Sequence, residues 1–429
     1  MLRTALVLAA LGAALRAQQA EPDFTWPMTT ARRAFEAGQS GYLAAVLDLL
    51  DREAEARKDP DLTQLFLDVL GAQWALVGEE QRATAAGDEA FAAVLRSAPA
   101  PEGEPFAGLH PVPALDTLVA LAQERRLVLV NEEHRSSIQR AFSNRLLAPL
   151  REAGFNYLAL ETLSEDDIAL AARGYPIFAS GTYTRDPVFG DIVRRALALG
   201  YKLVPYEASN AQMARQPDDT PISSTNRRES AQAHNLYERS FAIDPQARVL
   251  VIAGRDHIAE AEAGGWIPMG AVLERLSGRD PLTVNQFVMC EHSRPELEHW
   301  AYRLADEQGW LAGEPVILVD DAGLPWSANP EALDISLFHP RTRLLHGRPQ
   351  WMAMGGLRQP VEITPLQNDA PLLLQARVQG ESEQAIPLDQ CILWPGAPAP
   401  ALMLRPGSYE IVALDRAGHL LRREERTVK

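Results

Sequence analysis

Histidines and acidic residues follow directly after four short apolar runs in the middle of the chain. A carboxylate beside two imidazoles can bind Zn²⁺ or Mn²⁺, or can activate water by acid–base catalysis. These groups act together only if the fold brings the ends of the runs to one place. The runs and the residues that follow them are Leu127–Val130 with Glu132 and His134, Tyr157–Leu160 with Glu161, Leu203–Tyr206 with Glu207, and Val249–Ile252 with His257.

We assign expected roles to the residues at these four positions. The residues expected to activate water are Glu132, His134, Glu161 and His257, and the expected ligands of a divalent metal are His134, His257 and Glu161. Glu207 adds negative charge and is expected to bind substrate, and Arg228 is expected to neutralise the carboxylates or to bind an anionic group of a substrate. Each residue alone also has a plainer interpretation, because a strand-end Glu or His is often only a helix cap or a surface residue.

The elements that must position these residues form an α/β pattern. Continuous Val- and Leu-rich runs are typical of strands buried on both faces of a parallel sheet, and further strands are predicted at Leu282–Met289 and Val316–Val319. Helical patterns lie between them, so the carboxyl ends of the strands should meet at one edge, where such sheets bind ligands. The loop Glu207–Thr225 is predicted to cover that edge. The predicted helices are Ser136–Glu152, Pro187–Leu199, Asn226–Ile243 and Met269–Leu276.

The flanking segments differ in character from this core, which we place at 114–325. Residues 1–17 resemble a signal peptide, which predicts a secreted or periplasmic protein. Residues 18–113 predict two or three helices, broken near Pro60 and Gly78, and then a proline-rich linker. Residues 326–359 are expected to connect the core to a small β-sandwich-like module over 360–429. The fold class is therefore a mainly parallel α/β core with a helical N-terminal region and a C-terminal β module.

Composition excludes some functions and leaves others open. The 429 residues carry a formal charge of −16, which argues against nucleic acid as a partner. No later apolar run approaches the ~20 residues of a membrane span. Cys290 and Cys391 are expected to be separate free thiols. Motifs of the G-x-S-x-G, HExxH and GxGxxG types are absent from the sequence, so conventional serine hydrolases, zincins and dinucleotide enzymes lack support.

Two short motifs give the chain a resemblance to a known superfamily. Gly254-Arg255-Asp256-His257 matches a G-x-x-H motif, and Asn131-Glu132-Glu133-His134 matches a second one with Asn in place of Gly. In this pattern the chain, over residues 120–290, resembles the erythromycin esterase, ChaN and TraB/Tiki superfamily. The stretch from Arg228 to Asn235 is similar to the superfamily's Arg- and Asn-bearing helix, which implies a substrate-binding role for Asn235.

The site residues and the resemblance leave three functions in competition. The first is an exported hydrolase that activates water, with or without a divalent metal, to cleave an ester or amide bond in a small molecule or peptide. The second is a ChaN-like protein that binds haem or another ligand without turnover. The third is an inactive scaffold whose flanking regions bind other proteins.

Overall fold

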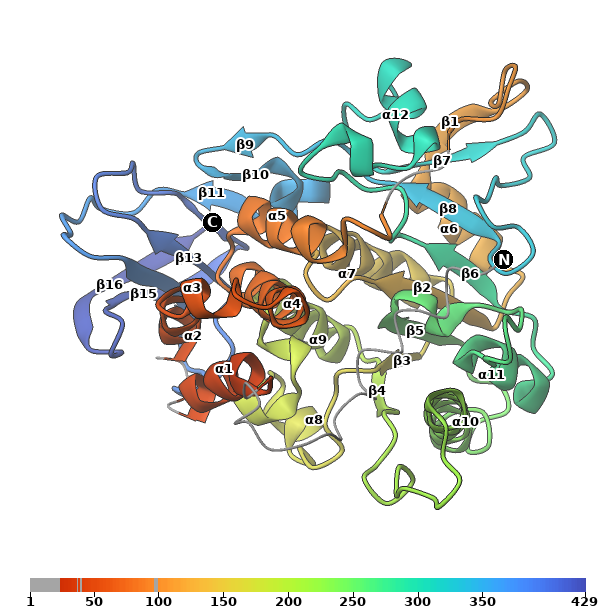
Figure 1. The fold of residues 1–429 in the computed structure, drawn as a ribbon, viewed down its shortest axis with the longest axis horizontal. Helices are drawn as coiled ribbons and strands as arrows, with labels where there is room; N and C mark the ends of the chain where they lie inside the picture. Colours follow the sequence, from red (N-terminus) through yellow and green to blue (C-terminus); the bar gives the residue numbers. More distant parts are fainter. Residues whose placement is uncertain (1–23, 37, 39–40, 96–98) are drawn as a thin grey trace.

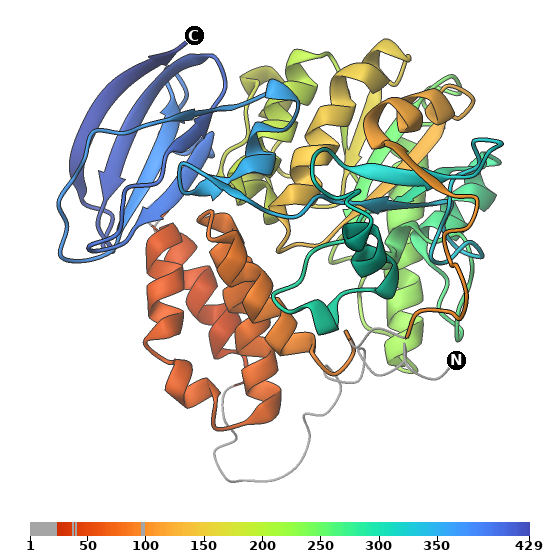
Figure 2. The same ribbon diagram turned by 90° about the horizontal axis from the view of Figure 1, so that it is seen from above.

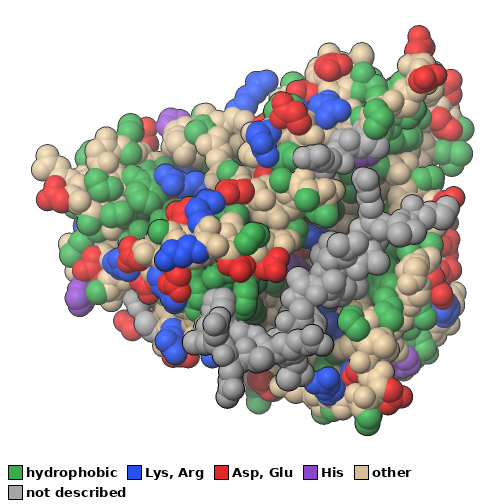
Figure 3. Space-filling view, viewed as in Figure 1, with side chains coloured by type: hydrophobic (Ala, Val, Ile, Leu, Met, Phe, Trp, Pro, Cys, Tyr) green, Lys and Arg blue, Asp and Glu red, His purple; other side chains and the backbone are tan. Residues whose placement is uncertain are grey.

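The computed structural model describes residues 24–36, 38, 41–95 and 99–429, so the predicted signal peptide at 1–17 lies outside the described residues. A central α/β part, a group of N-terminal helices and a C-terminal β-sheet make up the molecule, and the last two lie side by side at one end (Figures 1 and 2). Lys, Arg, Asp and Glu side chains intermingle over the N-terminal helices on the face shown in Figure 3.

The central sheet has eight strands in the order β1-β7-β8-β6-β2-β5-β3-β4. The neighbours β6, β2, β5, β3 and β4 pair in parallel, as the sequence predicts for the four runs that end at the candidate residues. Strand β8 is parallel to β6, whereas β7 and β1 are antiparallel to their neighbours. The strands are β1 (His110–Pro113), β2 (Leu127–Glu132), β3 (Tyr157–Leu160), β4 (Lys202–Pro205), β5 (Val249–Gly254), β6 (Leu282–Asn285), β7 (Val316–Val319) and β8 (Ile335–Phe338).

The sheet extends beyond residues 114–325 at both ends. Strand β1 lies in the segment expected to be a linker, and its two prolines are tolerated because it is the edge strand. Strand β8 lies in the segment expected to connect two parts, where Ser336 interrupts the apolar run. The predicted strand Leu282–Met289 ends early, at Asn285, because the next two backbone amides donate to the side chains of Asn131 and Asn285.

Helices cover both faces of the sheet, and alternate strand residues face opposite sides. Val128 and Val130 pack with one set of helices, while Leu127 and Leu129 pack with the other. The first set is α6 (Ala114–Ala122), α7 (Ser137–Glu152) and α9 (Pro187–Ala198), and the second is α10 (Pro221–Arg239) and α11 (Met269–Ser277). The short α8 (Leu170–Arg173) and α12 (Trp300–Glu307) lie nearer the periphery of the fold (Figure 1).

Helix α10 begins five residues before the start predicted from the sequence, and it ends four residues before the predicted end. Thr220 and Ser223 form a reciprocal capping box, and Pro221 occupies the first turn, which fixes the start. The predicted loop Glu207–Thr225 is shortened accordingly.

The N-terminal segment folds into more helices than the two or three predicted. Asp59 caps α4 through the amides of Asp61 and Leu62, and Gly78 follows its end with φ of +74°, so both predicted breaks are confirmed. The described helices are α1 (Trp26–Glu36), α2 (Gly41–Leu50), α3 (Glu53–Ala56), α4 (Pro60–Leu76) and α5 (Glu80–Phe91).

The C-terminal strands form an antiparallel sheet in the order β13-β12-β15-β16. Leu373 and Val412 on one face share a core with α2 and α4, so the two flanking regions pack against each other. The opposite face packs against the β11–β14 pair. The strands are β9 (Leu344–Leu345), β10 (Arg348–Pro349), β11 (Gln359–Val361), β12 (Leu372–Val378), β13 (Asp389–Leu393), β14 (Leu402–Leu404), β15 (Gly407–Leu414) and β16 (Leu420–Val428).

Two further expectations about the chain are met. Cys290 and Cys391 are both free thiols. Among the helices that the structure describes, none combines the length and the apolar character needed to cross a membrane.

Candidate active site

A cavity of about 400 Å³ opens at the carboxyl edge of β2, β3 and β4. Its walls include His134, Glu161, Glu207 and Arg228, and the first residues after β4 form one side of it. The cavity therefore lies where parallel α/β sheets place their ligand sites. The remaining lining residues are Thr162, Leu163, Ser164, Glu165, Asp166, Gly181, Thr182, Tyr183, Pro205, Ala208, Ser209, Asn210 and Arg239.

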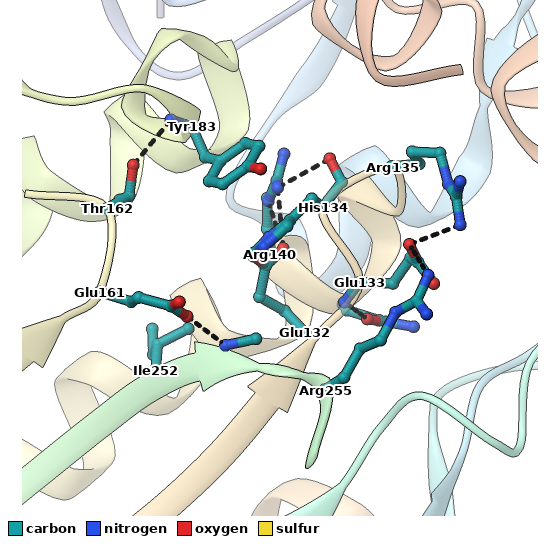
Figure 4. A network of polar contacts seen from close by, with 12 residues as sticks. Glu132, Glu133, His134, Arg135, Arg140, Glu161, Thr162, Tyr183, Ile252 and Arg255 are labelled. Atoms are coloured by element: carbon teal, nitrogen blue, oxygen red, sulfur yellow. Dashed lines mark hydrogen bonds and ion pairs between the residues drawn. The ribbon is translucent and has the colours of Figure 1, made fainter. Parts of the chain in front are cut away.

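Glu132 and His134 form a hydrogen-bonded pair beside this cavity (Figure 4). Glu132 ends β2 with 3% exposure, and its carboxylate lies 2.6 Å from Nδ1 of His134. Burial alone would raise the pKa of Glu132, but the charges of Arg140 and His134 lower it below its usual value. The ionised carboxylate accepts the Nδ1 proton, so Nε2 of His134 keeps a free lone pair.

The imidazole of His134 is also held by an aromatic neighbour. The rings of His134 and Tyr183 stack with centroids 3.8 Å apart and planes inclined by 17°. Thr162 fixes the position of Tyr183, because its hydroxyl accepts a hydrogen bond from the Tyr183 amide at 2.7 Å. The ring therefore has one orientation available to it, set by Glu132 on one side and Tyr183 on its face.

Arg140 on α7 supports Glu132 from behind, and the sequence analysis did not single it out. It has 0% exposure and lies between two carboxylates, donating to Glu132 at 2.8 Å and to Asp186 at 2.5 Å. A third hydrogen bond reaches the backbone carbonyl of His134 at 3.0 Å. A signal was present in the sequence, because Arg140 falls seven residues before the buried Leu147 and so on the same face of the helix.

Glu161 lies across the cavity from His134, at the end of β3. One carboxylate oxygen accepts the Gly254 amide at 2.6 Å, and the other lies 2.7 Å from Nη2 of Arg228 and 3.7 Å from Nε2 of His257. Burial would raise the pKa of Glu161, but the neighbouring positive charges and this amide lower it to about 2. The carboxylate is therefore ionised throughout the physiological range.

Gly254 allows His134 and Glu161 to approach each other. A Cβ atom at this position would lie 3.1 Å from the Glu161 carboxylate and 3.1 Å from Cε1 of His134. A larger residue would have to push one of these side chains away. The glycine of this motif is therefore explained by close contact with the two candidate catalytic groups.

His257 follows β5 and forms the second Glu–His pair. Its Nδ1 lies 2.8 Å from the carboxylate of Glu229, which has 1% exposure and also accepts the Met269 amide and the Trp266 indole. Burial lowers the pKa of His257, but Glu161 and Glu229 outweigh it and raise the pKa above its usual value. Glu229 was not predicted, although it follows the predicted Arg228 directly.

Arg228 joins the remaining candidate residues. Its guanidinium contacts Glu207 at 2.5 Å as well as Glu161, and its Nη1 lies 3.2 Å from Nε2 of His257. Asn235, expected to bind substrate, is buried and does not line the cavity. Its amide instead donates to the carbonyls of Tyr206 and Glu207, so it supports the loop that carries Glu207.

Glu133 and Arg135 fix the loop that carries His134, on the side that faces away from the cavity. Glu133 contacts Arg135 at 2.8 Å and Arg255 at 2.9 Å, away from the cavity (Figure 4). The side chain of Arg135 inserts between α4 and α5, where a Cβ at Gly71 would lie 2.8 Å from it and one at Gly87 3.0 Å. The N-terminal helices are thus anchored directly to the loop that holds His134.

The expected metal ligands lie close together, but a positively charged side chain, Arg228, already occupies the place between two of them. The guanidinium of Arg228 lies between Glu161 and His257, which is where a cation bridging these two groups would bind. Within the described residues, no group of three or more His, Cys, Asp and Glu side chains is arranged to hold a metal ion. The residues present therefore do not fit a Zn²⁺ or Mn²⁺ ion bound by His134, His257 and Glu161.

Comparison with known proteins adds only distant likenesses. No protein-family model and no curated protein matches the sequence. Among solved structures, the type III effector HopBA1 is 17% identical, with a TM-score of 0.30, covering 43% of this chain and 89% of its own. The MARTX toxin effector domain RRSP of Vibrio vulnificus is 18% identical, with a TM-score of 0.27, covering 46% and 40%. At such TM-scores the likeness does not establish a shared fold.

Proposed function

We propose that this protein is an exported hydrolase that uses His134 as a general base to activate water against an ester or amide bond. The observation that carries the proposal is the hydrogen bond between His134 and the buried Glu132, beside a polar cavity that Arg228 also lines, with His257 in contact with Arg228. A carboxylate that fixes the imidazole tautomer and stabilises its protonated form is a recurring arrangement for general-base catalysis.

The reaction would run through two proton transfers at His134. Nε2 takes a proton from water as the water oxygen attacks the carbonyl carbon, and Glu132 stabilises the imidazolium that forms. Arg228, which lines the cavity, stabilises the negative charge on the carbonyl oxygen, and the protonated form of His257 beside it adds positive charge. The imidazolium then returns its proton to the leaving alkoxide or amine as the carbon–oxygen or carbon–nitrogen bond breaks.

Membership of the erythromycin esterase, ChaN and TraB/Tiki superfamily is part of this proposal. The two Glu–His pairs and the close contact at Gly254 support a shared kind of site. The haem-binding alternative has less support, because the cavity is lined mainly by charged and hydroxyl groups, whereas cofactor sites are predominantly apolar. A Soret band in protein purified from its native compartment would favour that alternative instead.

The proposal is tested by comparing two histidine variants on p-nitrophenyl esters and p-nitroanilides. His134→Ala should lower kcat/KM by about 10²–10⁴-fold, the usual contribution of a general base. His234→Ala is the matched control, because His234 is an exposed residue of α10 whose ring bonds to Ser230 of its own helix. Near-normal turnover by a well-folded His134→Ala variant would exclude His134 as the base.

A further inference from the structure

The charged side chains that line the candidate active-site cavity are not balanced in number. Four carboxylates and two guanidinium groups reach it, which leaves a formal excess of two negative charges. Clefts lined by one sign of charge raise the local concentration of ligands of the opposite sign. The cavity should therefore attract cations and repel anions. The residues concerned are Glu161, Glu165, Asp166 and Glu207, against Arg228 and Arg239.

Both guanidinium groups are already bonded to carboxylates of the lining. Arg228 contacts Glu161 at 2.7 Å and Glu207 at 2.5 Å. Arg239 contacts Glu165 at 2.8 Å, and its other terminal nitrogen donates to a backbone carbonyl at 2.7 Å. Neither arginine is therefore left with a charge that could hold the carboxylate or phosphate of an anionic substrate.

The charged groups behind the lining do not reverse this excess. A protonated His257 is offset by Glu229, whose carboxylate lies 2.8 Å from its Nδ1. Beside the cavity, the guanidinium of Arg140 lies between two carboxylates, those of Glu132 and Asp186. The charge of the site is therefore negative whether or not His257 is protonated.

Asp166 is the lining carboxylate without a partner. It is exposed in the loop after β3, where its amide donates to the hydroxyl of Ser164. Over the residues that the structure describes, no hydrogen bond or ion pair reaches the carboxylate itself. The side chain of Glu161, five residues earlier, is only 10% exposed. The lining thus extends from the buried carboxylate of Glu161 to the exposed, unpaired one of Asp166.

We infer, building on the proposed hydrolysis, that the substrate carries an ammonium or guanidinium group and that Asp166 is the residue that selects it. A cation at the mouth of the cavity would form an ion pair with Asp166, and Glu165 and Glu207 would attract it from a greater distance. An anion in the same place would meet carboxylates with no free positive partner. Esters and amides of basic amino acids have the required chemistry.

The inference is tested with the Nα-acetyl p-nitrophenyl esters of lysine, norleucine and glutamate, which differ chiefly in side-chain charge. The lysine ester should have a kcat/KM about tenfold above that of the norleucine ester, and the glutamate ester should be the poorest. Asp166→Asn should lower the lysine-to-norleucine ratio about three- to fivefold, the usual size for an exposed ion pair, through KM rather than kcat. Added salt should lower the ratio in the wild type.

Asp321→Asn is the matched control, because Asp321 is also an exposed aspartate but does not line the cavity. It should leave the lysine-to-norleucine ratio unchanged. A wild-type ratio near one, or a ratio that Asp166→Asn does not lower, would overturn the inference.

A binding measurement separates this inference from the proposed hydrolysis. Cadaverine, 1,5-pentanediol and glutarate share a five-carbon chain and have no bond for a hydrolase to cleave. Cadaverine should bind in calorimetry and shift the ring resonances of His134, more weakly in Asp166→Asn, whereas the diol and glutarate should not. Cadaverine binding without turnover of any ester would support the inference and refute the hydrolase. Ester turnover in a protein that binds the diol or glutarate as well as cadaverine would do the reverse.

Discussion

Replacing Glu161 by glutamine tests whether the charges around the candidate active site are as tightly coupled as their contacts indicate. The variant keeps the size of the side chain but removes its charge and replaces one of its two acceptor oxygens by an amide donor. The pKa of this carboxyl falls from 4.5 to about 2 in the folded protein, which at ~1.36 kcal/mol per pH unit corresponds to about 3 kcal/mol of stabilisation. Glu161→Gln should therefore lower the free energy of unfolding at pH 7 by up to about 3 kcal/mol.

The pH dependence of this loss has a fixed sign. Because the folded protein binds the Glu161 proton more weakly than the unfolded chain does, the stabilisation is present above pH ~4.5 and is lost as the pH falls toward about 2. The difference in unfolding free energy between wild type and variant should therefore shrink over that interval in urea titrations. Glu262→Gln is the matched control, since its exposed pair with Arg275 contributes ~0–1 kcal/mol.

The same variant should change the pH dependence of catalysis. Glu161 is the strongest of the charges that raise the pKa of His257, so its neutralisation lowers that pKa. If the protonated form of His257 stabilises the transition state, the alkaline limb of kcat/KM should move to lower pH in Glu161→Gln. A stability difference that is the same at pH 3 and pH 7, with an unshifted alkaline limb, would refute the assigned electrostatics.

Three further outcomes are expected. Treatment with EDTA should leave esterase turnover unchanged, because Arg228 already lies between Glu161 and His257; loss of activity that Zn²⁺ or Mn²⁺ restores would contradict this. Leu158→Ala should cost ~2–5 kcal/mol of stability in urea unfolding, because Leu158 is fully buried in the sheet, and a smaller loss would question that packing. Arg135→Gln should lower kcat more than it changes KM, and Arg135→Lys should restore part of the rate. A loss of rate that is explained entirely by a lower melting temperature would indicate only a structural role.

The four strand-end runs were predictable because strands buried on both faces leave a continuous apolar signal in the sequence. Strands β1, β8 and β16 lack that signal for different reasons. Two prolines occupy β1, a serine interrupts β8, and the central residues of β16 are mostly charged because it is an edge strand. Their places in the sheets depend on pairing with distant segments, and that information is not local to the chain.

The residues of the candidate active site also fall into a predictable group and an unpredictable group. Residues that leave a strand, such as Glu132 and His257, could be predicted because the topology fixes where strand ends meet. Glu229 and Arg140 lie on helices, and their roles depend on which helix face turns toward the sheet. Glu229 can be buried because His257, Trp266 and Met269 donate hydrogen bonds to its carboxylate. No local pattern in the sequence reveals these three partners.

The two motifs differ at their first residue, and the difference has a physical cause. Glu132 is aligned with Gly254 across β2 and β5, so a side chain at 254 would enter the space shared by His134 and Glu161. Asn131 lies one residue earlier, within a regular strand and outside the positive-φ residues, so it needs no glycine. Its side chain donates to the carbonyl of Arg255 at 2.9 Å and accepts the amide of Gln286 at 2.6 Å. Asparagine at this position therefore joins the loops after β5 and β6, and it holds in place the loop from which His257 projects.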